Sequence, residues 1–163
     1  MNQEQAGLIM IALMTLALAG AGWGWWNRHK RYEPLARAMN WSVPAGEARY
    51  RAEGLYVATT EATKPLQRVA VKPLAYRSKV VVEVYPEGLV LRIRGSNPIL
   101  IPVGAGISAG RATWTIDRVV EPDGLVMVGW KLGEHDVESY FRLVDSDSED
   151  LILHIEQIGK AQR

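Results

Sequence analysis

The chain has 163 residues, a length that suits one globular domain rather than two. It carries 19 Lys and Arg against 18 Asp and Glu, and this near balance argues against a nucleic-acid partner, because domains that bind nucleic acid are usually strongly basic. The absence of Cys excludes disulfides, thiolate catalysis and zinc sites built from Cys.

The first predicted element is a membrane-spanning helix. Residues 6–26, AGLIMIALMTLALAGAGWGWW, contain no charged side chain, and at about 1.5 Å per residue they match the roughly 30 Å hydrocarbon core of a bilayer. A cleaved signal peptide is the alternative, with a small-residue cleavage site at Ala17 and Ala19. It is disfavoured because a signal peptide carries positive charge before its apolar run, where this chain has only Glu4. We therefore assign residues 1–26 to a transmembrane anchor.

The charges around this segment predict its orientation. No Lys or Arg precedes Arg28, whereas Lys30 and Arg31 follow it closely. The positive-inside rule then places the N-terminus outside and the C-terminal domain in the cytoplasm, so we expect a single-pass protein of the cell membrane. Six residues at this end of the helix are expected at the membrane interface, where aromatic rings and basic groups meet the lipid headgroups: Trp23, Trp25, Trp26, Arg28, Lys30 and Arg31.

A juxtamembrane connector is expected after the anchor. Residues 27–53 mix charged side chains with Pro34, Pro44 and Gly46, a composition typical of connecting segments. One short helical turn is expected inside it, at residues 35–39.

A mainly β domain is predicted over residues 54–163. Its first strand is expected at residues 55–60, which are rich in aromatic and β-branched side chains, and a loop follows at Lys64 and Pro65. Two hairpins are then predicted, because apolar residues alternate on both sides of two short turns that contain Pro and Gly. Two further strands bring the expected total to about seven. The hairpins pair 79–84 with 89–94 and 113–120 with 125–131, and the further strands are 99–101 and 136–143.

The chain ends in a predicted amphipathic helix. Residues 146–149, SDSE, have the pattern of a capping box, and Leu151, Ile155 and Ile158 fall on one helical face. Gly159 supplies a stop signal. A short-turned antiparallel sheet leaves open ends, so we expect the apolar face of this helix to cover one of them.

Seven strands and one terminal helix suggest a pleckstrin-homology-like (PH-like) barrel or sandwich closed by the C-terminal helix. Residues 56–60 (YVATT), 65–70 (PLQRVA) and 119–125 (VVEPDGL) resemble the actinobacterial membrane-anchored PH-like domain proteins. This resemblance implies one N-terminal membrane helix and a cytoplasmic PH-like domain. Genes of that family often lie among pyrimidine-synthesis genes, and some members are labelled transporters or export proteins. The resemblance brings no catalytic residues with it.

The best candidate for a binding surface is a basic stretch from residue 64 to residue 79 that contains no acidic residue. Near an anionic leaflet each such charge is worth about 1 kcal/mol, so the stretch suits either lipid headgroups or a protein partner. The alternative is an ordinary solvated face. The candidate residues are Lys64, Arg68, Lys72, Arg77 and Lys79.

Enzymatic and metal sites are not expected. The sequence has no G-x-S-x-G motif, and its three His residues are widely scattered. The acidic groups at 121–123 and 145–150 suit a turn and a helix start. The glycine-rich segment 104–110 lacks the Gly-Lys-Ser/Thr ending of a phosphate loop and leads into a strand. We therefore predict no catalytic residue, no metal site and no cofactor.

The predicted function is that of a non-enzymatic binding or scaffold module, such as an accessory subunit of a membrane complex. Its partners would be the lipid bilayer and a membrane or cytosolic protein, and no nucleic acid. Two alternatives are a component of a transport or export system and a sensor of anionic lipid at the inner leaflet. Transport is disfavoured because Thr15 is the one polar residue in the apolar run, whereas a transport path needs several.

Overall fold

The computed structural model describes residues 3–112, 114–115, 118–119, 124–144 and 147–160. The chain divides into two compact units, Met1–Pro34 and Leu35–Arg163. Helix α1 (Gln3–Ala38) supplies all of the described part of the first unit and the first residues of the second.

The first unit is a single apolar helix. Within α1, Gly7–Asn27 is long and apolar enough to span a membrane. Its large side chains are exposed, including Leu8 at 68% and Leu16 at 74%. A helix that is apolar all round needs apolar surroundings, so the segment is a candidate membrane anchor. The helix does not end there but continues to Ala38, which incorporates the helical turn expected at 35–39.

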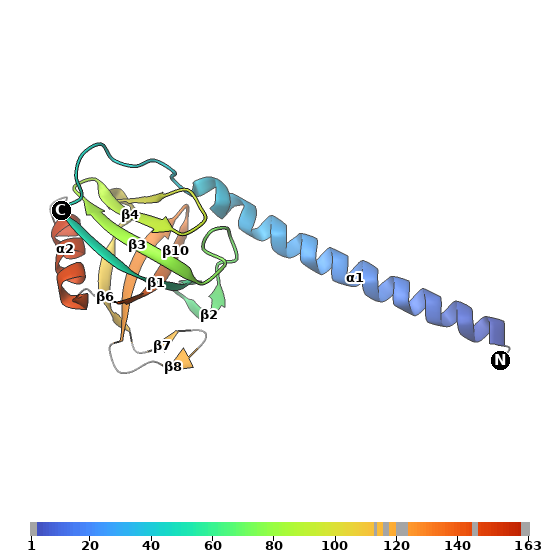
Figure 1. The fold of residues 1–163 in the computed structure, drawn as a ribbon. Helices are drawn as coiled ribbons and strands as arrows, with labels where there is room; N and C mark the ends of the chain where they lie inside the picture. The colour runs from blue at the N-terminus through green and yellow to red at the C-terminus, as the bar shows by residue number, and fades with distance from the viewer. Residues whose placement is uncertain (1–2, 113, 116–117, 120–123, 145–146, 161–163) are drawn as a thin grey trace. The chain divides into compact units, whose positions relative to one another are not determined.

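The second unit is built on one antiparallel sheet of eight strands, confirming the mainly β prediction (Figure 1). Seven strands follow the order β5-β4-β3-β1-β10-β9-β6, and β2 pairs with the end of β1. The sheet is not closed, because β5 and β6 are its two ends. The strands are β1 (Tyr50–Glu61), β2 (Lys64–Arg68), β3 (Ser78–Tyr85), β4 (Gly88–Ile93), β5 (Ile99–Pro102), β6 (Ser108–Ala112), β9 (Leu125–Leu132) and β10 (His135–Leu143); η1 (Val103–Ala105) is a short 3-10 turn, and β7 (Trp114–Thr115) pairs with β8 (Arg118–Val119).

Strand β1 joins the two halves of the sheet. Its first half pairs with β3, and its second half pairs with β10, beginning at Gly54 opposite Leu143. The register shifts between Tyr56 and Ala58, which marks a bulge that bends the strand. Because one long strand serves both halves, the sheet folds over and encloses an apolar core. The strand begins at Tyr50, earlier than the expected residue 55.

Two details of the strand prediction were wrong. The predicted loop at Lys64 and Pro65 begins the short strand β2. The second predicted hairpin is also different, because β9 pairs with β6 and β10, and the described residues 114–115 and 118–119 pair with each other. Strand β6 has the sequence SAGRA, which lacks the β-branched and aromatic residues typical of strands, so its pairing depends on tertiary contact with β9. Most of the predicted turn at 121–124 lies outside the described residues.

The terminal helix α2 (Ser148–Lys160) confirms the predicted apolar face. Leu151, Ile155 and Ile158 are buried, and α2 packs against strands of the sheet, β6 among them. At its N-terminus the Glu149 N–H donates to the Asp147 carboxylate at 2.9 Å, which satisfies one free amide of the first turn. The predicted capping residue Ser146 lies outside the described residues.

Candidate binding groove

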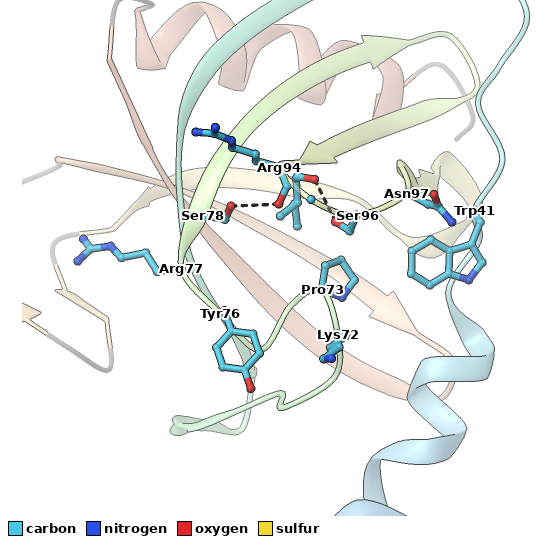
Figure 2. A pocket seen from close by; sticks show the side chains of 11 residues that line it. Trp41, Lys72, Pro73, Tyr76, Arg77, Ser78, Arg94, Ser96 and Asn97 are labelled. Carbon is cyan, nitrogen blue, oxygen red and sulfur yellow. Dashed lines mark hydrogen bonds between the residues drawn. The ribbon is translucent and has the colours of Figure 1, made fainter.

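A groove of about 660 Å³ lies beside one end of the β3–β4 hairpin (Figure 2). Strands β3 and β4 are antiparallel, so the first residues of β3 lie next to the last residues of β4, with Val80 opposite Ile93. The loop before β3, the turn after β4 and the segment after α1 complete the walls. The lining residues are Trp41, Lys72, Pro73, Tyr76, Arg77, Ser78, Ile93, Arg94, Gly95, Ser96 and Asn97.

The groove is positively charged. Lys72, Arg77 and Arg94 line it, all three are exposed, and no acidic residue is among the lining residues. In Figure 2 the Arg77 and Arg94 side chains extend to the same side of the view, away from Trp41 and Asn97. Basic side chains without acidic residues in the same lining create a positive electrostatic potential in the groove. The low dielectric constant of the protein walls strengthens this potential. The groove therefore suits an anionic group.

Two aromatic side chains stand at the same place. Trp41 is 44% exposed and Tyr76 is 67% exposed, although both carry large apolar surfaces. Exposed aromatic rings next to arginines are the composition typical of the energetically dominant part of protein interfaces. The groove thus combines charge with apolar contact area.

The loop that forms one wall is firmly attached to the sheet. Its residues Val69, Val71 and Leu74 are buried in the core. The Arg68 guanidinium donates to the Ala75 carbonyl at 3.2 Å and to the Val57 carbonyl at 3.0 Å. A charged donor shared between two carbonyls holds the loop against β1, so the wall exists before any ligand binds.

A buried chain of polar groups reinforces that attachment. The Trp130 indole N–H donates to the Ser139 hydroxyl at 3.0 Å, Ser139 lies 2.7 Å from the Thr59 hydroxyl, and the Tyr56 hydroxyl lies 2.8 Å from both the Thr59 hydroxyl and the Leu74 carbonyl. Every hydrogen finds an acceptor if each group donates to the next and Tyr56 donates to Leu74. Burial raises the pKa of Tyr56 well above its ordinary value, which keeps the phenol neutral.

The structure distributes the five residues of the predicted basic stretch over several places. Lys72 and Arg77 line the groove, whereas Arg68 is half-buried and bonded to the backbone. Lys64 lies 4.0 Å from the Glu61 carboxylate, and Lys79 is exposed on β3.

Arg94 was missed by the sequence analysis because it follows β4 and lies outside the basic stretch. The backbone N–H of Arg94 donates to the backbone carbonyl of Lys79 at 2.9 Å across the hairpin. The signal was available in the predicted pairing of 79–84 with 89–94, which places residue 94 beside the start of the first strand.

The predicted membrane-interface residues all lie in α1. Trp23, Trp25 and Trp26 are exposed, and the Lys30 ammonium lies 5.3 Å from the centre of the Trp26 ring. Arg28 and Arg31 belong to the helix, but their side chains are outside the described set. That these six residues contact lipid headgroups stays a prediction.

The family assignment follows from the sequence match. Residues 38–156 match a family model described as Bacterial PH domain-like, from the end of α1 to α2. A comparison with curated proteins finds no match. The matched span contains every strand of the sheet and both walls of the groove. The chain belongs to the Bacterial PH domain-like family.

Proposed function

We propose that this protein is a membrane-anchored, non-enzymatic scaffold module that docks an acidic segment of a partner protein in its basic groove. PH-like domains are generally non-catalytic modules that bind lipids or proteins, and this supports the binding role. The single observation that carries the proposal is the gathering of Lys72, Arg77 and Arg94 without any acidic residue in the same lining.

A protein segment is favoured over a lipid headgroup by the aromatic residues. Trp41 and Tyr76 add apolar contact area that an acidic peptide with aromatic or aliphatic side chains would cover. A phosphorylated lipid headgroup would interact mainly with the basic side chains of the groove and would leave the aromatic side chains without a partner. The arginines also favour carboxylates, because a guanidinium can form two parallel hydrogen bonds with one carboxylate.

The partner would be a protein that lies at the membrane. Only residues 28–40 separate the candidate anchor from Trp41, and even a fully extended chain of that length reaches at most roughly 50 Å. An anchored domain on so short a connection meets membrane proteins and proteins recruited to the cytoplasmic surface. An accessory subunit of a membrane complex fits this restriction, and a component of a transport system would be a special case of it.

The proposal is tested by charge reversal in the groove. The full-length chain is purified with a tag from native membranes, and proteins that accompany it are identified. The variant Arg77→Glu/Arg94→Glu should lose the accompanying protein. The control Lys131→Glu/Arg142→Glu makes the same change of charge at exposed residues of β9 and β10, outside the groove lining, and should retain it.

A second measurement separates protein from lipid. The wild-type chain is placed in nanodiscs of neutral lipid and of lipid containing anionic headgroups, and the fluorescence of Trp41 is followed against a Trp41→Phe variant. A change on adding the identified partner, in neutral discs, supports the proposal. A change with anionic lipid alone, abolished by Arg77→Glu/Arg94→Glu, would replace it with a lipid sensor.

A further inference from the structure

One wall of the groove comes from the segment that follows α1. Trp41 lies in this segment, whereas every other lining residue belongs to residues 72–97 (Figure 2). Residues 39–49 connect α1 to β1, and we call them the strap. The strap belongs to the same compact unit as the sheet. A ligand that fills the groove and covers Trp41 therefore contacts the connection to the candidate anchor as well as the β3–β4 hairpin.

The residue before Trp41 joins the strap to the sheet. The Leu100 N–H of β5 donates to the Asn40 carbonyl at 2.8 Å, and the two residues form an antiparallel bridge. The side chain of Met39, which precedes Asn40, is buried. The backbone of the strap is thus fixed on the sheet directly before Trp41.

The Asn40 side chain also fixes the residue that follows Trp41. Its Oδ1 accepts one hydrogen bond from the Ser42 N–H at 3.1 Å and another from the Ser42 hydroxyl at 2.8 Å. An Asn side chain that accepts from the backbone two residues onward closes a turn. Trp41 is the residue enclosed by this turn, so Asn40 restricts the backbone both before and after the indole ring.

The middle of the strap lies in solvent. Residues 41–43 and 45–47 are exposed, and the strap returns to the sheet at Ala48, which packs against an apolar cluster of β3, β4 and β5. A segment with few buried contacts has low local stability. The position of Trp41 therefore depends on the contacts of Asn40 rather than on the middle of the strap.

We propose that Asn40 is a positioning residue that fixes Trp41 as a wall of the groove and thereby couples the groove to the strap. This coupling rests on the proposed function, because it concerns the same groove. Coupling between two sites is reciprocal. A strap docked through Asn40 raises the affinity of the groove for an acidic segment, and an acidic segment in the groove strengthens the docking of the strap. Movement of the strap away from β5 withdraws Trp41 and weakens binding.

Collisional quenching of Trp41 fluorescence tests the position of its ring. The full-length chain is placed in nanodiscs of neutral lipid, and the Trp41 signal is the difference from a matched Trp41→Phe variant. A ring in a positively charged groove should be quenched more by iodide than by the neutral quencher acrylamide. Asn40→Ala should abolish this iodide preference. Gln157→Ala removes an exposed amide of α2 outside the groove lining and should keep it.

A disulfide separates the docking of the strap from other effects of the substitution. Asn40→Cys/Leu100→Cys places two thiols on bridge partners, whose Cα atoms are about 4.5–5.5 Å apart in antiparallel pairs, within the range that a disulfide spans. The wild-type chain has no Cys that could compete. The oxidised pair should show the wild-type iodide preference, and the reduced pair should show the loss expected for Asn40→Ala. Equal preference in both forms, or an unchanged preference in Asn40→Ala, would overturn the proposal.

Hydrogen exchange tests the reciprocal coupling with hexa-glutamate as the acidic probe. Hexa-glutamate added to the wild-type chain should slow exchange of the Leu100 N–H, which is the donor to Asn40, and should leave exchange in β9 and β10 unchanged. Arg77→Glu/Arg94→Glu should abolish this slowing.

Two negative results have different meanings. If the wild-type chain binds hexa-glutamate through Arg77 and Arg94 without slowing exchange at Leu100, the coupling is refuted and the proposed function stands. If the wild-type chain does not bind hexa-glutamate and its Trp41 shows no iodide preference, the groove is not an anion site, and the proposed function and the coupling fall together.

Discussion

A Cβ atom on Gly54 would lie 2.5 Å from the backbone oxygen of Arg142, closer than any real contact allows. Here β1 pairs with β3 and β10 at once, and the absence of a side chain lets β10 pass close to β1. The obstacle is backbone rather than a movable side chain. This residue pair therefore marks where the sheet folds over its core.

The first prediction follows from that contact. Gly54→Ala should lower the free energy of unfolding by about 1–3 kcal/mol, because the two strands must separate to admit the methyl group. Chemical denaturation of the full-length chain in detergent measures the loss. Gly110→Ala is the matched control, since its Cβ would find an ordinary 3.7 Å contact and should change stability little. Equal stability of both variants would contradict the close approach.

The second prediction concerns the Tyr56 hydroxyl. Tyr56→Phe removes the donor that the buried Leu74 carbonyl uses and interrupts the polar chain to Thr59, so it should cost about 1–3 kcal/mol. It should also speed hydrogen exchange in the loop 69–77, because this hydrogen bond attaches the loop to β1. Tyr76→Phe serves as control, since Tyr76 is 67% exposed and its hydroxyl is accessible to water. An unchanged exchange rate in the loop would refute the positioning role.

The third prediction is a loss of stability in alkali. Burial and then the hydrogen bond to the Glu138 carboxylate raise the pKa of Tyr140 to about 12, and burial raises the pKa of Tyr56 further. A tyrosine in the unfolded chain titrates near about 10, so above that pH the unfolded state loses these protons first. The contribution is complete below pH about 10 and should fall as pH rises toward the pKa values of the folded protein.

Denaturant unfolding at a series of pH values from neutral to alkaline measures this dependence. Tyr140→Phe removes one of the two groups and should make the decline of stability with pH less steep. A slope identical to that of the wild-type chain would show that Tyr140 titrates alike in both states.

The fourth prediction concerns α2. Ile155→Asp places an unpaired carboxylate in a fully buried position and should cost several kcal/mol, about 3–5 by comparison with other buried charges that lack a partner. Thermal unfolding measures the effect. Leu153→Asp on the exposed side of the same helix controls for helix propensity and should have little effect. A stable Ile155→Asp variant would mean that the helix face is not needed by the sheet.

The fifth prediction is the membrane topology. A reporter enzyme that is active only outside the cytoplasm should be inactive when fused after Arg163 and active when placed before Asn2, because Arg28, Lys30 and Arg31 favour the cytoplasmic side. A reporter active only in the cytoplasm should give the opposite pattern. Activity of the outside reporter at the C-terminus would place the PH-like domain on the other side of the membrane.

Local patterns in the sequence determined much of the fold. The hairpin of β3 and β4 was predictable because Val80, Val82 and Val84 alternate before a turn that contains Pro86 and Gly88. The spacing of Leu151, Ile155 and Ile158 likewise predicted which side of α2 is buried. These signals succeed because side-chain alternation and helical periodicity are properties of neighbouring residues.

Other features were decided only by tertiary structure. Strand β6 carries almost no intrinsic strand preference, so its pairing with β9 depends on tertiary contact rather than on its own sequence. Hairpin pairing likewise places Arg94 in the lining of the groove with Lys72 and Arg77. The Arg68 guanidinium instead donates hydrogen bonds to the carbonyls of Val57 and Ala75. A list of basic residues cannot separate these roles, because a guanidinium finds its partner by distance in space and not along the chain.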